Sequence, residues 1–394
     1  MSTKILVVDD EPDLEQLIRQ KFRRNIRDNE FVFLFARSGL DAVAKLEAEP
    51  DVDLVLTDIN MPEMDGLTLL GKIDEMNATA LKSVVVSAYG DMENIRVAMN
   101  RGAFDFVTKP INLSDLEITI NKALRESSLV KEALRTRDEL IAIQQELNVA
   151  TEIQMSMLPR VFPSVEERRG VDIFATMLPA KEVGGDLYDV FSVGAHRIAF
   201  VIGDVSGKGV PAALLMGISR TLLRSAGREG HSAHECLTVV NRIISEEILP
   251  NMFVTVFYGI FDAETGELQY CSGGHNPPYL LSRDGSVTAL NGGGGLPVGV
   301  LSDATYTSAH AQLSPGDAVV LYTDGVTEAQ DREEQEFGEK RLEDLLSRMH
   351  AQPAKTMVNQ TVEAVQAFAK DVPQRDDITC LVLRFVGNGS KPTD

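Results

Sequence analysis

The sequence predicts an α/β doubly wound parallel sheet, then one long helix, then an α+β sandwich. Three observations predict this order. Short apolar runs alternate with amphipathic, helix-length stretches in the first third of the chain, and a stretch without glycine or proline follows them. The remainder contains strand-like runs and two grouped pairs of helices. The expected boundaries are 1–124 for the first domain, 125–157 for the linker helix, 158–387 for the second domain, and 388–394 for a disordered tail.

The first domain is expected to contain five parallel strands. Their apolar runs are continuous, as is typical of strands that helices bury on both faces. The runs are 5–8, 31–36, 54–57 and 84–87, with a weaker fifth run at 104–108. Helices are expected between them, for example at 14–26 and 65–76. In such a sheet, ligands bind at the carboxyl ends of the strands.

Acidic residues occupy those carboxyl ends. Asp9 and Asp10 follow the first strand, and Asp58 follows the third. Two carboxylates about 4 Å apart repel each other by about 4 kcal/mol at an effective dielectric constant of about 20. The cluster is therefore expected to hold a cation or to keep one acid protonated. Oxygen ligands suit Mg²⁺, and an aspartate beside Mg²⁺ can accept a phosphoryl group that a lysine neutralises.

Four separated motifs resemble the response-regulator receiver domain, over the whole first domain. They are 9-DD-10, 58-DINMPEMDG-66, 87-SA-88 and 109-KP-110. The resemblance implies that Asp58 is the phosphoacceptor and that Asp9, Asp10, Asp58 and the carbonyl of Asn60 hold Mg²⁺. It also implies that Ser87 hydrogen-bonds the phosphoryl group, that Lys109 pairs with it, and that the Lys109–Pro110 bond is cis. A sensor histidine kinase is the implied partner.

Two alternatives accompany this assignment. Asp53 is a rival acceptor by position, but only Asp58 is followed by the Asn-Met-Pro turn. The domain could also be a receiver-shaped module that dimerises without being phosphorylated. Phe106 stands where the family usually places an aromatic residue near the lysine, and it lacks the hydroxyl of a tyrosine-type switch.

The linker is expected to be one helix that starts at a capping box formed by Ser114 and Glu117. Its length corresponds to roughly 60 Å at 1.5 Å per residue. Apolar side chains at alternating three- and four-residue steps follow, as in a coiled coil. They are Leu140, Ile143, Leu147, Ala150 and Met157, with Gln154 as a polar interruption. This spacing favours a parallel two-helix coil and hence a homodimer; the alternative is a helix that packs on its own second domain.

The second domain is expected to contain antiparallel strands. The strand-like runs are 196–204, 252–262, 267–272, 317–324 and 377–385. A turn at 264–266 predicts a hairpin between two of them. Helical pairs are expected at about 211–249 and 340–370, which together with the strands indicates an α+β sandwich.

Four motifs in this domain place an aspartate next to glycines or in a turn. They are 184-GGDLYD-189, 203-GDVSGKG-209, 323-TDGVTE-328 and 374-QRDDIT-379. Carboxylates without a histidine or thiol partner select hard divalent ions such as Mg²⁺ or Mn²⁺. Two such ions about 4 Å apart would lower the pKa of a bridging water and neutralise a phosphoryl group.

These motifs, in this order, resemble the SpoIIE-type branch of the PPM (protein phosphatase 2C-like) serine/threonine phosphatases, from about residue 157 to 385. The resemblance implies an α-β-β-α sandwich with two Mn²⁺ or Mg²⁺ ions between the sheets. Its implied ligands are Asp204 bridging both ions, the carbonyl of Val205, Asp186 for one ion, and Asp324 and Asp376 for the other, with Asp377 as the fallback for Asp376.

The general acid of the implied reaction is not assigned by these motifs. Many eukaryotic members place a histidine two residues after the bridging aspartate, whereas this chain has Ser206 there. His275 is a substitute candidate. The favoured alternative is that His275 only fixes a turn.

Composition excludes several classes of function. Lys and Arg total 38 against 59 Asp and Glu, so the formal net charge is -21, which is unsuited to binding nucleic acid or an anionic membrane. Three widely separated cysteines suit a reducing cytoplasm, and the sequence lacks an apolar stretch that could span a membrane. A diguanylate cyclase is excluded because Leu187 and Tyr188 follow the Gly-Gly-Asp string.

The two resemblances together imply a response regulator whose phosphorylation at Asp58 controls the phosphatase. Its implied substrate is a phosphorylated STAS-domain anti-sigma factor antagonist in a partner-switching pathway. The alternative is an adaptor, as in RssB-type response regulators, that binds a stationary-phase sigma factor and delivers it to the ClpXP protease. The intact acidic motifs of the second domain favour the enzyme.

Overall fold

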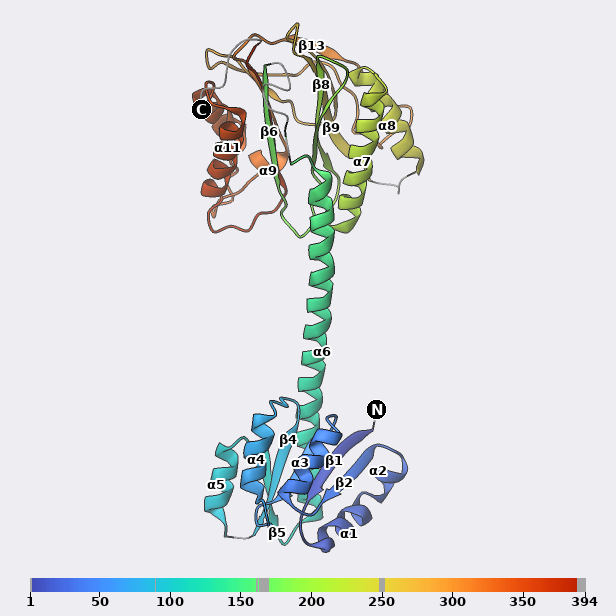
Figure 1. Ribbon diagram of the computed structural model, residues 1–394, viewed down its shortest axis with the longest axis vertical. Helices are drawn as coiled ribbons and strands as arrows, with labels where there is room; N and C mark the ends of the chain where they lie inside the picture. Colours follow the sequence, from blue (N-terminus) through green and yellow to red (C-terminus); the bar gives the residue numbers. More distant parts are fainter. Residues whose placement is uncertain (1, 89, 161, 163–169, 248–251, 388–394) are drawn as a thin grey trace. The chain divides into compact units, whose positions relative to one another are not determined.

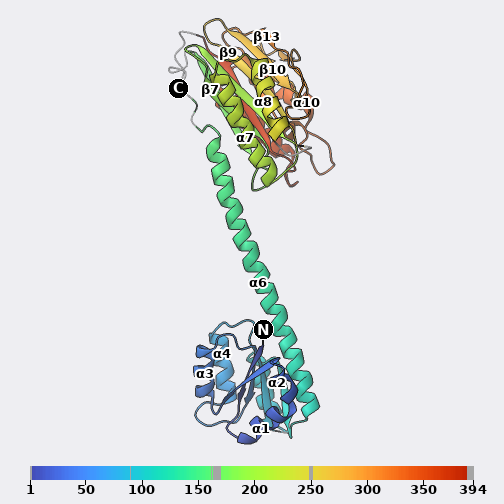
Figure 2. The ribbon, with the colours of Figure 1, turned by 90° about the vertical axis from the view of Figure 1, so that its right-hand side faces the viewer.

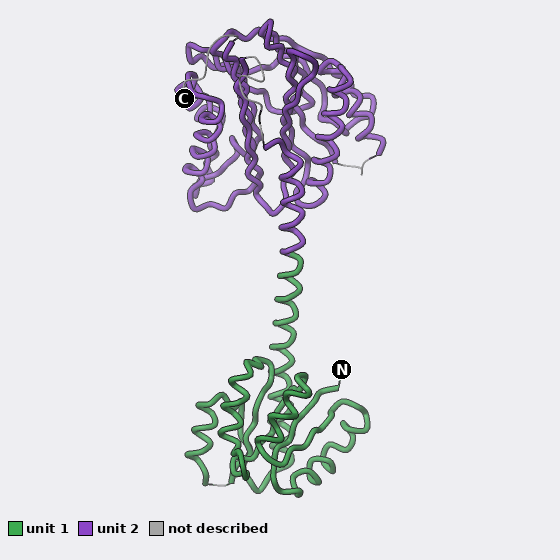
Figure 3. The backbone as a smooth tube through the Cα atoms, viewed as in Figure 1, with its two compact units in different colours: residues 1–143 green, residues 144–394 purple. Residues whose placement is uncertain are grey.

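The computed structural model describes residues 2–88, 90–160, 162, 170–247 and 252–387 (Figure 1). Its contacts divide the chain into two compact units, residues 1–143 and 144–394 (Figure 3). The division falls within one helix, α6 (Leu113–Met157), so each unit contains part of that helix. The expected tail at 388–394 lies outside the described residues.

The first unit contains one parallel sheet, which confirms the predicted fold class. Its strands follow the order β2-β1-β3-β4-β5. Their bounds are β1 Thr3–Val8, β2 Phe31–Ala36, β3 Leu54–Asp58, β4 Lys82–Ala88 and β5 Asp105–Lys109. Because all strands run the same way, the acids that follow β1 and end β3 lie at one edge of the sheet.

Helices bury both faces of this sheet. They are α1 Pro12–Lys21, α2 Arg23–Arg27, α3 Gly39–Ala48, α4 Gly66–Glu75 and α5 Met92–Asn100. One apolar cluster contains side chains of α1 and of the first turns of α6, and another contains those of α3 and α4. The single helix predicted at 14–26 is divided into α1 and α2, because the buried Phe22 ends the first of them.

Helix α6 begins at Leu113, one residue before Ser114, which was predicted to cap it. Asn112 lies before the first turn, and its Oδ1 accepts hydrogen bonds from the backbone N–H groups of Ser114 at 2.9 Å and Asp115 at 3.5 Å. Capping by Ser114 was therefore the wrong prediction, since Asn112 satisfies the free N–H groups instead. Although α6 has 45 residues, neither it nor any other described helix is both long and apolar enough to cross a membrane.

The described residues of the second unit form two five-stranded sheets. Their orders are β13-β10-β9-β8-β7 and β12-β11-β14-β15-β6, and the neighbouring strands are antiparallel. The first sheet comprises β7 Leu187–Ser192, β8 Arg197–Val205, β9 Val254–Asp262, β10 Glu267–Gly273 and β13 Ala309–Gln312. The second comprises β6 Val171–Leu178, β11 Tyr279–Leu281, β12 Val287–Ala289, β14 Ala318–Tyr322 and β15 Ile378–Phe385.

Helices cover the outer faces of the two sheets, which confirms the predicted α-β-β-α sandwich (Figures 1 and 2). Helices α7 (Val210–Arg228) and α8 (Ala233–Glu247) pack on the first sheet. Helices α10 (Gly338–Arg348) and α11 (Ala354–Phe368) follow the short α9 (Asp324–Thr327), and α11 packs on β6 and β15. Alternate residues of β15 face opposite sides: Leu381 and Leu383 point between the sheets, while Cys380 and Val382 face the helices.

Candidate phosphotransfer and metal sites

In the first unit, three aspartates gather at the carboxyl edge of the parallel sheet. Asp9, Asp10 and Asp58 each place one carboxylate oxygen within 4.8 Å of the others. Asp9 and Asp58 are buried, whereas Asp10 is exposed. Oxygen ligands of this kind, partly open to solvent, suit Mg²⁺ together with water and a phosphoryl group.

Lys109 lies beside this cluster. Its Nζ is 2.5 Å from Oδ2 of Asp58 and 3.3 Å from Oδ2 of Asp9. Burial alone would lower the pKa of Lys109, but the hydrogen bond to Asp58 and the charges of Asp58 and Asp9 outweigh burial and raise it. Burial raises the pKa of Asp9, which the backbone N–H of Glu11 and the charge of Lys109 partly oppose. The peptide bond between Lys109 and Pro110 is cis.

Among the described residues, no hydrogen bond joins the side chain of Ser87 or Asn60 to Asp9, Asp10 or Asp58. Ser87 is fully buried near the end of β4, and its Oγ donates a hydrogen bond to Oδ2 of Asp91 at 3.2 Å. The backbone N–H of Asn60 donates to Oδ1 of Asp58 at 3.3 Å. Asp53 lies at the opposite end of β3, where its carboxylate accepts from the backbone N–H of Lys4 at 2.8 Å and pairs with Lys131 at 2.5 Å. Its carboxylate is thus already engaged.

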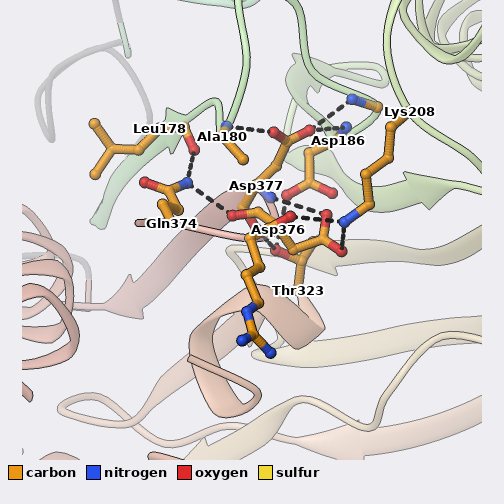
Figure 4. Close-up of polar contacts among 10 residues, drawn as sticks. Leu178, Ala180, Asp186, Lys208, Thr323, Gln374, Asp376 and Asp377 are labelled. Carbon is orange, nitrogen blue, oxygen red and sulfur yellow. Dashed lines mark hydrogen bonds and ion pairs between the residues drawn. The ribbon is translucent and has the colours of Figure 1, made fainter. Parts of the chain in front are cut away.

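In the second unit, both sheets contribute acids to one cluster (Figure 4). Asp186 immediately precedes β7, and Asp204 is the second-last residue of β8, ahead of Val205. Asp324 begins α9 two residues after the end of β14, and Asp376 lies two residues before β15. The first sheet therefore supplies two aspartates, and the second sheet supplies the other two.

The charges of these aspartates strongly affect one another. Burial, followed by the charges of Asp324, Asp376 and Asp377, raises the pKa of Asp204 to about 7. Burial and the charge of Asp204 raise the pKa of Asp186 well above its ordinary value. Burial and the charge of Asp376 likewise raise the pKa of Asp324. Such a set of carboxylates fits hard divalent cations, because bound cations would neutralise charges that burial and mutual repulsion make costly.

Two buried threonines orient Asp186. The Oγ1 hydroxyls of Thr323 and Thr379 donate to Oδ2 of Asp186 at 2.7 Å and 2.5 Å. The backbone N–H of Thr379 donates in turn to Oγ1 of Thr323 at 3.1 Å. Sequence reasoning did not assign these threonines, although both stand within the quoted motifs. Because both hydroxyls bind the same oxygen, they fix the orientation of the Asp186 carboxylate.

The adjacent Asp376 and Asp377 have different surroundings. Oδ1 of Asp377 accepts from the backbone N–H of Ala180 at 2.8 Å, and Oδ2 accepts from those of Gly185 at 2.6 Å and Asp186 at 3.3 Å (Figure 4). Both oxygens of Asp377 therefore hold the loop that leads to β7. Oδ1 of Asp376 accepts from the backbone N–H of Asp377 at 3.0 Å, and its Oδ2 pairs with Lys208 at 2.7 Å. The side chain of Asp376 is 38% exposed, so a cation could replace Lys208 there, whereas both oxygens of the buried Asp377 hold the backbone.

Lys208 is a further charged residue that sequence reasoning did not assign. Its Nζ lies 2.7 Å from Oδ2 of Asp376 and donates to the backbone carbonyl of Arg375 at 2.7 Å. The hydrogen bond to Asp376 raises the pKa of Lys208. The lysine is part of the quoted 203–209 motif, and it places one positive charge at the edge of the acidic cluster.

His275 is buried, and both nitrogens of its ring have hydrogen-bond partners. Its Nδ1 lies 2.9 Å from Oγ1 of Thr255, and its Nε2 lies 3.1 Å from the carbonyl oxygen of Tyr322. Burial lowers the pKa of His275 to about 4. A neutral ring with both nitrogens engaged favours the structural alternative over a general acid. Ser206 accepts a hydrogen bond at its Oγ from the backbone N–H of Phe253 at 2.9 Å.

Two family descriptions match the chain. Residues 5–121 match the Response regulator receiver domain, and residues 194–386 match Stage II sporulation protein E (SpoIIE). The first match covers the parallel sheet and the beginning of α6. The second covers most of the sandwich, including Asp204, Asp324 and Asp376.

Individual proteins show the same similarity. Protein IcfG of Synechocystis sp. is 31% identical over 276 residues, which are 59% of this chain and 42% of IcfG. Phosphoserine phosphatase RsbU of Bacillus subtilis is 31% identical over 243 residues, which are 61% of this chain and 70% of RsbU. The chain thus spans less than half the length of IcfG.

A solved structure shows the fold of the second unit. The SiaA-PP2C domain of Pseudomonas aeruginosa is 25% identical with a TM-score of 0.55, and the similarity covers 63% of this chain and 98% of that domain. The fold, the placement of the acids and the similarity to RsbU agree with one another. The chain belongs to the SpoIIE family, with a SpoIIE-type PP2C phosphatase domain that follows a response regulator receiver domain.

Proposed function

We propose that this chain is a two-component response regulator in which phosphorylation at Asp58 controls a metal-dependent protein serine/threonine phosphatase. The observation that carries the proposal is that aspartates from two sheets lie close together: burial, followed by the charges of Asp324, Asp376 and Asp377, raises the pKa of Asp204 to about 7. The proposed parts are a receiver domain at 1–124, a linker helix at 125–157 that pairs two chains, and a phosphatase domain at 158–387.

In the receiver, the Asp58 carboxylate would accept a phosphoryl group from a sensor histidine kinase. Lys109 already contacts Oδ2 of Asp58 and would balance the negative charge of the acyl phosphate. Ser87 would exchange its hydrogen bond to Asp91 for one to a phosphoryl oxygen. Asp9, Asp10, Asp58 and the carbonyl of Asn60 would hold Mg²⁺.

In the phosphatase domain, Asp204 would bridge two metal ions. The remaining ligands would be Asp186, the carbonyl of Val205, Asp324 and Asp376. Bound Mn²⁺ or Mg²⁺ supplies an acidified water and neutralises the phosphoryl charge. Thr323 and Thr379 hold the direction of the Asp186 carboxylate, and Lys208 lies where it can balance charge beside Asp376.

The substrate is proposed from the relatives. RsbU is named a phosphoserine phosphatase. We extend this to a phosphoserine or phosphothreonine on a STAS-domain anti-sigma factor antagonist, in a cytoplasmic partner-switching pathway. The adaptor alternative is not favoured, because the acids needed for catalysis are present and two curated relatives are phosphoserine phosphatases.

The test is hydrolysis of phosphorylated STAS proteins by the full chain with Mn²⁺, with and without an acyl-phosphate mimic on Asp58. Asp204→Asn should lower kcat by about a thousandfold, since metal ions provide several kcal/mol of transition-state stabilisation. Asp303→Asn changes an exposed aspartate and serves as the control. Undiminished hydrolysis by Asp204→Asn would refute the metal site, and equal rates with and without the mimic would refute control by Asp58.

A further inference from the structure

The last turns of α6 contain a buried glutamine among exposed neighbours. Gln154 is 4% exposed, whereas Ile153 and Met157 are 54% and 42% exposed. In the sequence, Gln154 interrupts the coiled-coil spacing of apolar residues along the helix. A buried amide must have hydrogen-bond partners, because an unpaired polar group in the interior is costly.

Gln154 pairs with the backbone of one residue through both ends of its amide. Its Nε2 donates to the carbonyl oxygen of Gly184 at 2.6 Å, and the backbone N–H of Gly184 donates to Oε1 of Gln154 at 3.0 Å. The Oγ1 hydroxyl of Thr151, one helical turn earlier, lies within hydrogen-bond distance of two carbonyl oxygens, those of Glu182 and of Leu147, and its one proton serves both. These side chains connect α6 to the backbone of residues 182–184. The N–H and the carbonyl of Gly184 are both hydrogen-bonded to the amide of Gln154.

This backbone leads directly to Asp186. Gly184 stands two residues before it, and the intervening Gly185 and Asp186 itself donate to Asp377. There is little room for adjustment, since a Cβ at Gly184 would lie 2.5 Å from Oδ2 of Asp377. The loop is therefore held by Gln154 on one side and by Asp377 on the other, and a shift at Gly184 would move Asp186.

We propose that Gln154 is a positioning residue of the metal site: its amide fixes the Gly184 backbone and so holds the Asp186 carboxylate toward Asp204. The inference rests on the proposed function, in which Asp186 is a metal ligand. The last turns of α6 would therefore contribute to metal binding, although Gln154 lies outside the four acidic motifs. The competing explanation is that Gln154 only anchors α6 to its domain.

The two explanations differ in what they predict for metal affinity. The test measures Mn²⁺ binding to the full chain by electron paramagnetic resonance of free Mn²⁺, with Asp58→Asn in every sample to weaken the receiver site. Gln154→Met keeps the length of the side chain but removes both hydrogen bonds. It should weaken Mn²⁺ binding about 10- to 100-fold, as loss of a residue that orients a ligand does in other metal sites. The control is Gln145→Met, at an exposed position of the same helix.

Thermal unfolding separates positioning from anchoring. A lower unfolding temperature with Mn²⁺ affinity within twofold of the parent would overturn the inference, as would unchanged values of both. If Gln154→Met does not fold, Thr151→Val tests the same connection, and it should weaken Mn²⁺ binding several-fold; unchanged affinity there would overturn the inference too. A parent protein that binds no Mn²⁺ would refute the proposed function itself, together with this inference.

Discussion

The two acidic clusters of this chain balance their charge in different ways. In the receiver, Lys109 lies between Asp9 and Asp58 and contacts both. In the phosphatase domain, Lys208 contacts Asp376 at the edge of the cluster, while the pKa of Asp204 reaches about 7. The receiver carries an internal cation at its centre, whereas the phosphatase cluster must take up protons or external cations.

The difference follows from how each cluster is built. Asp9, Asp58 and Lys109 stand at the ends of strands in one parallel sheet, where a side chain from β5 can reach across to the acids of β1 and β3. The other cluster lies where two sheets meet, so more acids face one another. Asp186 is 1% exposed, whereas Asp204, Asp324 and Asp376 are partly exposed. Each additional unneutralised acid raises the cost of ionising its neighbours, and the burial of Asp186 adds to that cost.

The largest expected effect concerns stability without metal. In EDTA at pH 8, Asp204→Asn should stabilise the phosphatase domain by on the order of 3 kcal/mol, because it removes a buried charge whose pKa is raised to about 7. Asp58→Asn should not stabilise the receiver, because it removes a partner of Lys109. Differential scanning calorimetry of the full chain measures both, and equal stabilisation by the two substitutions would contradict the comparison.

The second prediction concerns pH. Because the folded pKa of Asp204 lies above its unfolded value of about 3.8, the folded state binds an additional proton between about pH 4 and pH 7. The metal-free phosphatase domain should therefore lose stability as pH rises through this window. Mn²⁺ must displace that proton, so its affinity should rise by up to about tenfold per pH unit and level off above about pH 7.

Titrations of Mn²⁺ binding by calorimetry between pH 5.5 and 8.5 check the affinity. Unfolding scans in EDTA over the same range check the stability, with Asp204→Asn as the control that should flatten the pH dependence. Affinity that is constant over this range would show that Asp204 is ionised throughout, and the contrast between the two clusters would be lost.

The smallest expected effect concerns the two lysines. The side chain of Lys208 is 45% exposed, and exposed ion pairs contribute at most about 1 kcal/mol, so Lys208→Met should change stability by less than that. It should tighten Mn²⁺ binding a few-fold, because Asp376 loses a competing cation. Lys109→Met should destabilise the receiver by about 2 kcal/mol or more, since it leaves two buried acids without their cation. Chemical denaturation measures both, and equal losses would contradict the comparison.

Most of the architecture could be predicted from the sequence. The runs at 5–8, 31–36 and 54–57 became β1, β2 and β3 almost residue for residue, because continuous apolar stretches of strand length leave few alternatives. Strands β6, β7 and β11 to β13 were not predicted. Strands β11, β12 and β13 have only three or four residues, which is too short for an alternating pattern to stand out. In β6, buried and partly exposed residues alternate in the structure, but Phe174 and Leu178 are apolar at partly exposed positions and obscure that alternation in the sequence.

The sequence by itself determined which acids could meet, since each of Asp9, Asp58, Asp204 and Asp324 stands beside a strand end that its own neighbours define. Only the tertiary structure decided how those acids are held. The hydrogen bonds that hold them join residues 30 to 193 positions apart. They link Thr323 and Thr379 to Asp186, Asp377 to Gly185, and Gln154 to Gly184. Single hydrogen bonds over such separations have no periodicity in the chain, because they depend on packing that forms only when both sheets and α6 are assembled.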